Sequence, residues 1–344
     1  MGDSWLASVF QKKWLGLFLG LSMLVALFIG AYSLSIAEIW KIVTLESEGA
    51  QQFLLINIRL PRILLAAITG AGLAISGAAI QGLFRNPLAD QTLIGVTSGA
   101  MLFAVLSIVF LGSLVAKYSV FLEQISVSVF AFIGGFLTTY LVYFLSRREG
   151  KTYVMTMLLA GIAISAFAGA ITGLIIYLSD DQQLRDITFW SMGSFSGANW
   201  VQVGISGPII FGGIYLLSRY SRALNAFLLG EQEALYLGIS VEQVKSRIIL
   251  LTALIVGICI SMSGIIGFVG LVIPHLLRLI KGSDHRYLLV ASAIVGALFL
   301  VFADTIARTI IAPAELPIGI LTAVVGAPFF LWLLIQSYKN RMLA

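Results

Sequence analysis

The feature that most constrains this chain is an uncharged run of 22 residues between Arg62 and Arg85. A helix needs about 20 apolar residues to cross the hydrocarbon core of a bilayer, so the run is long enough to span a membrane. It is rich in glycine, alanine and serine, which let helix backbones approach closely inside a membrane. The run is therefore predicted to lie inside a helix bundle and not against lipid.

The whole chain shares this apolar character. Of its 344 residues, 59% are hydrophobic and only 11% are charged, and the mean hydropathy is +1.02. A soluble domain of this size needs more charged side chains on its surface. The composition therefore predicts an all-α integral membrane protein. The apolar run 14–34 is longer than the core of a signal peptide, and we interpret it as an uncleaved first helix.

Hydropathy predicts about ten membrane spans in a single transmembrane domain, residues 1–344. The spans cover approximately residues 14–34, 60–83, 92–111, 124–145, 153–178, 200–218, 248–263, 265–280, 287–311 and 316–336. The eighth is short and contains Gly267, Gly270 and Pro274, so we expect a broken or re-entrant element buried in protein. No pair of spans shows the internal repeat typical of many secondary transporters.

Loop charge predicts the orientation of the chain, because cytoplasmic loops carry an excess of lysine and arginine. If the N-terminus is inside, all but six of the 21 Lys and Arg residues fall on the cytoplasmic side. The six predicted to lie outside are Lys41, Arg59, Arg62, Lys117, Arg185 and Arg308. This asymmetry favours an even number of spans with both termini cytoplasmic. It also explains the net charge of +5 without a nucleic-acid partner.

Few residues suggest catalytic chemistry. Residues 149–152 read EGKT, like the end of a phosphate-binding loop, but Leu145 stands where that motif requires its first glycine. The chain is therefore not expected to bind nucleotide through such a loop. One cysteine and two histidines are too few for a disulfide or a metal cluster. Asp304 is the main ionisable candidate within a span, and a local ion pair with Arg308 at i,i+4 spacing would explain it.

The loop 219–247 is predicted to be cytoplasmic. Residues 229–239 read as a short amphipathic helix ended by Gly238, and a second short helix is expected over Val241–Arg247. One interpretation is an interfacial helix that lies on lipid headgroups. The glutamates in this loop would be repelled by an anionic leaflet, so a docking surface for a cytoplasmic protein fits the charge better.

Three arginines lie at the predicted outer ends of spans, against the inside bias: Arg59, Arg62 and Arg308. Each could reach lipid phosphate by snorkelling. Together they suggest a basic rim that could hold carboxylates of a partner, because the arginine guanidinium binds carboxylates in a bidentate manner.

The outer segment 179–199 mixes charged, aromatic and glycine residues. It could form a short helix that caps a pore between the fifth and sixth spans. An ordinary interfacial belt, with Trp190 and Trp200 at the headgroups, is the alternative.

Several longer stretches are specific enough to compare with a known family. They are RLPR (59–62), SGAAIQGLFRNPLAD (76–90), IGVTSGA (94–100), LLAGIAIS (158–165), FWSMGSFSGANW (189–200), LGEQEALYLGI (229–239), GIIGFVGLVIPHLLRLIKGSDHR (264–286), ADTIAR (303–308) and AELPIGILTAVVGAPFFLWLL (314–334). In these stretches the chain resembles the permease subunits of type II ABC importers. This is the FecCD or cobalamin-permease family, which takes up ferric siderophores, haem and vitamin B12. The stretches run in family order over almost the whole chain.

The resemblance implies a homodimer of ten-helix subunits in the bacterial cytoplasmic membrane. Two separate ATPase subunits would supply ATP and Mg, and no cofactor would be bound directly. They would dock at the coupling loop, where the matching residues are Gly230, Glu231, Glu233, Ala234, Leu237 and Gly238. A periplasmic or lipid-anchored binding protein would dock at Arg59, Arg62 and Arg308, and Asn86-Pro87-Leu88 would match a cytoplasmic gate.

The chain departs from the family at two places. Gln91 stands where many relatives carry proline, and Val154-Met155-Thr156 lacks the small polar pair of the cobalamin permease. The second departure leaves a second gate element unassigned and counts slightly against cobalamin. The hypothesis is therefore a non-catalytic permease for an iron complex, haem or a ferric siderophore, with cobalamin left open. Two rivals from other classes are an ion-coupled secondary carrier, which would need buried ionisable residues, and a non-transporting membrane scaffold.

Overall fold

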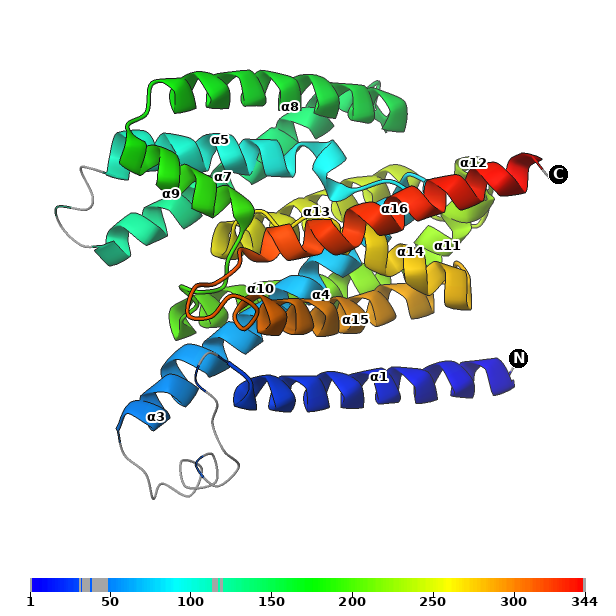
Figure 1. The fold of residues 1–344 in the computed structure, drawn as a ribbon. Coiled ribbons are helices and arrows are strands. Elements are labelled where there is room, and N and C mark those ends of the chain that lie inside the picture. The colour runs from blue at the N-terminus through cyan, green and yellow to red at the C-terminus, as the bar shows by residue number, and fades with distance from the viewer. Residues whose placement is uncertain are drawn as a thin grey trace.

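The computed structural model describes residues 2–30, 32, 38, 49–112, 117 and 120–342. In this part of the chain the ordered elements are helices and one two-stranded hairpin (Figure 1). The first helices are α1 (Gly2–Phe28), α3 (Ala50–Phe53), the π-helical η1 (Leu54–Arg59), α4 (Leu60–Leu83), the 3-10 helix η2 (Gln91–Ile94), α5 (Val96–Leu106), the π-helical η3 (Ser107–Leu111) and α7 (Val120–Ser146). The strands β1 (Arg147–Arg148) and β2 (Lys151–Thr152) follow. The remaining helices are α8 (Val154–Tyr177), α9 (Asp181–Met192), α10 (Trp200–Arg219), α11 (Ser221–Leu229), α12 (Glu231–Tyr236), α13 (Val241–Ser263), α14 (Val269–Lys281), α15 (His285–Ala307) and α16 (Ile318–Met342).

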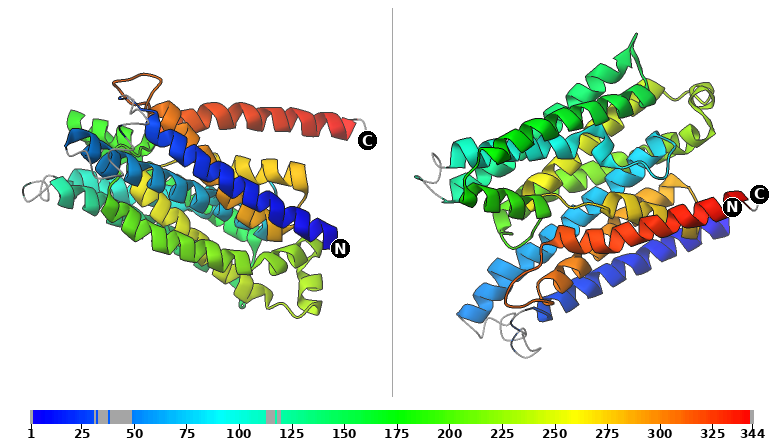
Figure 2. Two further views of the ribbon diagram at one scale, coloured as in Figure 1. Left: turned by 90° about the horizontal axis from the view of Figure 1, so that it is seen from below. Right: turned by 45° about the horizontal axis from the view of Figure 1, so that its top comes forward.

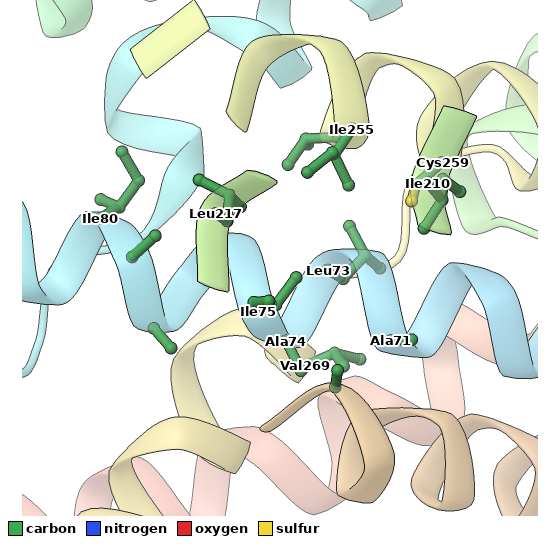
Figure 3. Packing of buried hydrophobic residues seen from close by; sticks show 14 of the residues in the cluster. Ala71, Leu73, Ala74, Ile75, Ile80, Ile210, Leu217, Ile255, Cys259 and Val269 are labelled. Atoms are coloured by element: carbon green, nitrogen blue, oxygen red, sulfur yellow. The ribbon is translucent and has the colours of Figure 1, made fainter. Parts of the chain in front are cut away.

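Helix α4 lies at the centre of the bundle and packs against α1, α10, α13, α14 and α15. With α3 and η1 it forms a continuous helix, Ala50–Leu83, whose most apolar window is 94% buried, against 22% for α8. Figure 3 shows Leu73 of α4 facing Ile255 and Ile210 from α13 and α10. The prediction that this run lies inside a bundle is confirmed. The predicted span 60–83 coincides with α4, and the helix extends beyond it to Ala50 through η1 and α3.

Glycine explains how closely α4 approaches its neighbours. A Cβ atom added at Gly70 would lie 2.2 Å from the carbonyl oxygen of Gly296 on α15. A Cβ atom added at Gly77 would lie 1.8 Å from the carbonyl oxygen of Gly270 on α14. The backbones therefore touch directly, and the small residues of α4 are required by packing and not only by composition.

A second group of helices, α5, α7 and α8, packs on one side of this centre and contacts it through α13. Gly99 of α5 crosses α7 at the backbone carbonyl of Gly134, where an added Cβ would lie 2.4 Å from the oxygen. In Figure 1, α8 lies at one edge of the bundle and α1 at the opposite edge.

Each of the ten predicted spans coincides with helix in the described residues. Six helical segments there are long and apolar enough to cross a membrane, and three shorter apolar ones cover 13–28, 96–111 and 318–332. The remaining predicted span, the eighth, corresponds to α14, which has 13 residues. Part of the first predicted span and most of the connection that follows it lie outside the described residues.

The eighth predicted span is broken, as expected. Residues 264–268 are not helical, Gly264 and Phe268 have positive φ angles of 70° and 68°, and α14 begins only at Val269. Irregular backbone at this depth must be buried in protein or line a cavity. Gly264 meets that requirement, because it packs against the carbonyl of Trp190 and the backbone of Gly193.

Both termini lie at the same end of the bundle, together with α12 (Figure 1). We call this the terminal end, and the end that carries α3 and α9 the opposite end. The loop 219–247 contains α11 and α12 at the terminal end, and the predicted short helix ended by Gly238 is confirmed as α12. The predicted second helix, Val241–Arg247, is not separate, because it forms the first turns of α13.

The EGKT segment forms a β-hairpin and not a phosphate-binding loop. Strands β1 and β2 pair antiparallel, with Arg147 opposite Thr152 and Arg148 opposite Lys151. The two turn residues, Glu149 and Gly150, have φ angles of 52° and 77°. Positive φ at both central residues is the geometry that matches the twist of a two-residue hairpin.

Candidate functional sites at the two ends of the bundle

At the terminal end, α11 places α12 at the edge of the bundle. The apolar face of α11, with Leu224, Ala226 and Phe227, is buried against the core. Asn225 ties α11 to the start of α15, because its Nδ2 donates to Asp284 Oδ1 at 2.7 Å and its Oδ1 accepts from the His285 amide at 2.8 Å. Partial burial opposes the charge of Asp284, but the hydrogen bonds from Asn225 and the Arg286 amide outweigh it and lower the pKa.

The predicted coupling residues form one short helix with well-defined ends. Gly230 precedes α12 with φ 142°, a backbone conformation that residues with a Cβ rarely adopt, so glycine is favoured there. Gly238 follows α12 with φ 78°, the left-handed conformation that commonly ends a helix. Ala234 is fully buried and anchors the helix, while Leu237 is exposed.

Exposed apolar side chains gather on and beside α12, next to the exposed Gln232 and Glu233. Four of them, which we call the α12 patch, are Leu229 at the end of α11, Leu235 and Tyr236 on α12, and Leu237 directly after it. Tyr236 is 88% exposed. In the right-hand view of Figure 2, the chain around α12 projects from the end of the bundle and its axis differs from those of the long helices. Exposed apolar clusters of this kind mark sites of interaction with protein or membrane.

One glutamate of α12, whose side chain is 37% exposed, pairs with a buried lysine. Glu231 Oε2 lies 2.6 Å from Lys245 Nζ on α13, and Lys245 is 3% exposed. The same Nζ contacts Glu242 Oε1 at 3.3 Å and donates to the carbonyl of Thr152 at 3.1 Å. This contact joins α12, α13 and the hairpin.

The predicted gate residues form a turn directly after α4. Asn86, Pro87 and Leu88 are all exposed, and Asn86 Oδ1 accepts from the Leu88 amide at 2.9 Å. This side-chain contact is typical of an asparagine-initiated turn. Gln91, close behind it, is buried, and an added Cβ on Gly270 would lie 2.2 Å from its Oε1.

At the opposite end, the charged centre is Arg62. Its guanidinium binds Asp304 of α15 in a bidentate manner, with both carboxylate oxygens within 3.0 Å, and contacts Glu315 Oε1 at 2.7 Å. Arg62 is 6% exposed and Asp304 is 2% exposed. The expected local pair between Asp304 and Arg308 is therefore wrong, because the partner of Asp304 comes from α4 across the bundle.

The other two arginines bind the end of α1. Arg59 donates to the carbonyls of Leu27 and Tyr32, and Arg308 donates to the carbonyl of Ala26 at 2.5 Å. The last carbonyls of a helix lack intrahelical partners and carry partial negative charge, so cations stabilise them. The three arginines thus lie together, but they are only 4–6% exposed and do not form an open basic rim in this chain.

The segment 179–199, at the opposite end, contains the predicted short helix, α9. Asp180 and Gln183 form a reciprocal capping box at its start, as Asn199 and Gln202 do at the start of α10. Trp200 Nε1 donates to the carbonyl of Ile56 at 3.0 Å. This contact ties the tryptophan to the helix that carries Arg59.

Within the described residues there is no group of three or more His, Cys, Asp or Glu side chains that could hold a metal ion. Cys259 is buried against α4, where an added Cβ at Gly72 would lie 2.8 Å from its sulfur. Its place in the core is a packing role.

Comparison with known proteins decides the family. The sequence pattern of the FecCD transport family matches residues 18–336. The chain belongs to the FecCD transport family.

The relatives of this FecCD protein are ABC importer permeases. The hemin transport system permease protein HmuU of Yersinia pestis is 45% identical over 312 residues, covering 91% of each chain. The vitamin B12 import system permease protein BtuC of Vibrio cholerae is 38% identical over 337 residues, covering 96% of this chain and 97% of that protein. A solved structure of a metal-chelate type ABC transporter in an inward-facing conformation matches with a TM-score of 0.80 at 35% identity, covering 94% of this chain and 98% of that one. The predicted family and the type II permease fold are confirmed.

Sequence reasoning missed three residues of this FecCD permease: Tyr236, Lys245 and Glu315. Lys245 had a usable signal, because it lies on the apolar helical stripe of Val241, Val244 and Ile248, so it had to be buried and paired. The exposure of Tyr236 is explained by the burial of Ala234, because the side of α12 that carries Ala234 faces the core and Tyr236 points away from it. Glu315 has no local signal, because its partner Arg62 is 253 residues away in the chain.

Proposed function

We propose that this permease is the non-catalytic membrane subunit of an ATP-driven importer for an iron complex, haem or a ferric siderophore. The observation that carries the proposal is the α12 patch, a group of exposed apolar side chains on and beside a short helix that is fixed at the terminal end of a permease of this family. The hemin permease relative supports an iron complex as substrate. The vitamin B12 permease relative keeps cobalamin as the second candidate.

In this proposal two ATPase subunits bind ATP and Mg and dock on the terminal end, which faces the cytoplasm. A docked ATPase would contact the α12 patch and Glu233, which is also exposed. Closure of the ATPases would shift the spans and bias the pore between outward-facing and inward-facing states. The Asn86–Leu88 turn lies at the end of α4 and would serve as part of the cytoplasmic gate. The chain would lie in the cytoplasmic membrane with both termini inside.

An ion-coupled carrier fits the buried charges less well. Among the described residues, the buried charged side chains are Arg59, Arg62, Lys245, Asp304 and Arg308. They lie at the two ends of the bundle and not in a chain across it, and Asp304 and Lys245 are each held in an ion pair. A proton or ion relay needs ionisable groups along the path through the membrane.

We also propose that two copies of the chain assemble around the translocation path. Helix α8 forms an edge of the bundle and leaves Leu159, Ile162, Phe167 and Leu174 exposed. Among the described residues, nothing lies within 4 Å of a Cβ added at Gly169 or Gly173, so a second copy could approach closely there.

Replacing Tyr236 with aspartate is expected to lower the amount of ATPase that copurifies with the permease by about tenfold, as for an aromatic at the centre of an interface. ATP-dependent hemin uptake into proteoliposomes that contain the ATPase and binding-protein partners should fall with it. Tyr177→Asp is the matched control, because Tyr177 is 84% exposed at the opposite end. Undiminished ATPase binding by the Tyr236 variant would reject the docking site. Uptake of hemin and cobalamin without ATP hydrolysis would reject the proposed function.

For the binding protein, we propose that an acidic side chain docks near Arg59, Arg62 and Arg308. Because the three guanidinium groups are buried, changing them to glutamate would damage the fold and would not test docking alone. Glu315 offers a cleaner test, since its side chain is 37% exposed and occupies one side of Arg62.

Replacing Glu315 with glutamine is expected to raise the affinity for the binding protein about threefold, because a partly exposed charge pair is worth up to about 1 kcal/mol. The change removes the negative charge of Glu315, which otherwise competes with the binding protein's carboxylate for Arg62. Asp181→Asn on α9 removes an exposed negative charge at the same end and controls for general repulsion. Equal effects of the two variants on binding, measured by surface plasmon resonance, would argue against docking at Arg62.

A further inference from the structure

The buried ammonium group of Lys245 joins three segments that are separate in the sequence, and its two glutamate partners are 37% and 35% exposed. An ammonium group has three donor hydrogens, and Lys245 directs them to Glu231 of α12, Glu242 of α13 and the carbonyl of Thr152 in β2. Glu242 uses its second oxygen to accept from the Thr152 amide at 2.7 Å. Both backbone groups of Thr152 are therefore held by α13.

Thr152 transmits its position directly to two long helices. It pairs with Arg147 in the hairpin, and the next residue, Tyr153, donates from its amide to the Ser146 carbonyl at the end of α7. Helix α8 begins at Val154. A displacement of Thr152 must therefore move the α7–α8 turn and the first turn of α8.

The same contact borders the last turn of α4. A cavity of about 220 Å³ is lined by the hairpin, by Glu231, Glu242 and Lys245, and by Leu83, Phe84 and Arg85. Arg85 and Lys151 add two cations to its wall. The proposed gate residues, Asn86–Leu88, follow directly in the chain. The cavity thus lies where α12, the α7–α8 turn and the gate meet.

Stability alone does not explain a lysine at this position. Lys245 lies in the apolar stripe of α13, where a leucine would be buried without desolvation of a charge. Replacing a buried ion pair with apolar residues is often neutral or stabilising. What the ammonium group adds is a directional connection between three segments, because one buried nitrogen donates to acceptors in α12, α13 and β2.

We infer that Lys245 is a positioning residue that makes α12, the start of α13 and the β1–β2 hairpin move as one body, so that ATPase motion reaches the α7–α8 turn and the gate. The inference rests on the proposed docking of the ATPase at α12. It assigns Glu231 to this internal connection, and leaves contact with the ATPase to the α12 patch.

Replacing Lys245 with methionine is expected to lower the amount of hemin transported per ATP hydrolysed by about tenfold, a typical size for coupling between two sites. The complex should still bind its ATPase and hydrolyse ATP at a rate within about twofold of wild type, since the α12 patch is unchanged. The assay uses proteoliposomes that contain the whole complex. Arg247→Met is the matched control, because Arg247 lies on the same helix and is exposed.

A distance measurement separates coupling from simple loss of structure. Spin labels at Gln232→Cys and Glu149→Cys, both exposed, report the separation of α12 and the hairpin, and the native Cys259 is buried. The distance distribution should stay the same with and without ATP in wild type and broaden in the Lys245→Met variant. If the methionine variant does not fold, Glu231→Gln, which leaves the contacts of Lys245 with Glu242 and Thr152, replaces it in both assays.

The outcomes distinguish the inference from the proposed function. If the unmodified complex moves neither hemin nor cobalamin with ATP, the proposed function fails. The inference alone is overturned if the unmodified complex transports hemin and the Lys245 variant keeps both its amount of hemin transported per ATP hydrolysed and its distance distribution. A parallel loss of ATPase binding, ATP hydrolysis and uptake would also overturn it, because it would indicate a purely structural role.

Discussion

Replacing Gly77 with alanine is expected to lower the free energy of unfolding by about 3 kcal/mol or more, at the upper end of the range for overpacking. The new methyl group would lie 1.8 Å from the backbone oxygen of Gly270, so no side-chain rotation can relieve the overlap. Helices α4 and α14 must separate, and the centre of the bundle moves with them. Thermal stability in detergent, followed by size-exclusion chromatography, measures the loss.

Gly212→Ala on α10 is the matched control. Among the described residues, nothing lies within 4 Å of a Cβ added there. Alanine favours a helix over glycine by about 1 kcal/mol, so the control should be neutral or slightly stabilising. Equal stability of the Gly77 and Gly212 variants would show that the crossing of α4 and α14 is not as close as described.

Replacing Arg62 with methionine is expected to destabilise the protein by about 3–5 kcal/mol, the usual cost of leaving one member of a buried ion pair without its partner. Asp304 would be left among apolar helices, with both oxygens deprived of the guanidinium. The measurement is the unfolding midpoint in detergent and the yield of folded protein.

The double variant Arg62→Met with Asp304→Leu is the decisive comparison. Removing both charges avoids the unpaired carboxylate, and such replacements are often neutral or stabilising. We therefore expect the double variant to recover most of the stability lost in the single one. If it is less stable than Arg62→Met, the two side chains contribute independently and the ion pair is not the source of the effect.

Local sequence patterns were sufficient to place the apolar helices approximately and to predict the end of α12 at Gly238. An apolar run of membrane length forms a helix because every backbone group must be satisfied within the segment. Gly238 ends α12 because glycine adopts a positive φ at little cost. The small residues of the Arg62–Arg85 run predicted its central position for a similar reason, since such residues are needed where backbones touch. The family followed from stretches of sequence that kept their order along the chain.

Only the tertiary structure decided what the charged residues do. Arg62 pairs with Asp304, 242 residues away, and Lys245 holds a carbonyl 93 residues away. Local spacing instead suggested a pair between Asp304 and Arg308, and an exposed rim of arginines. The physical reason is that the free energy of a charge depends on which groups surround it after folding. Helix formation is set by neighbours in the sequence, whereas desolvation and pairing are set by neighbours in space.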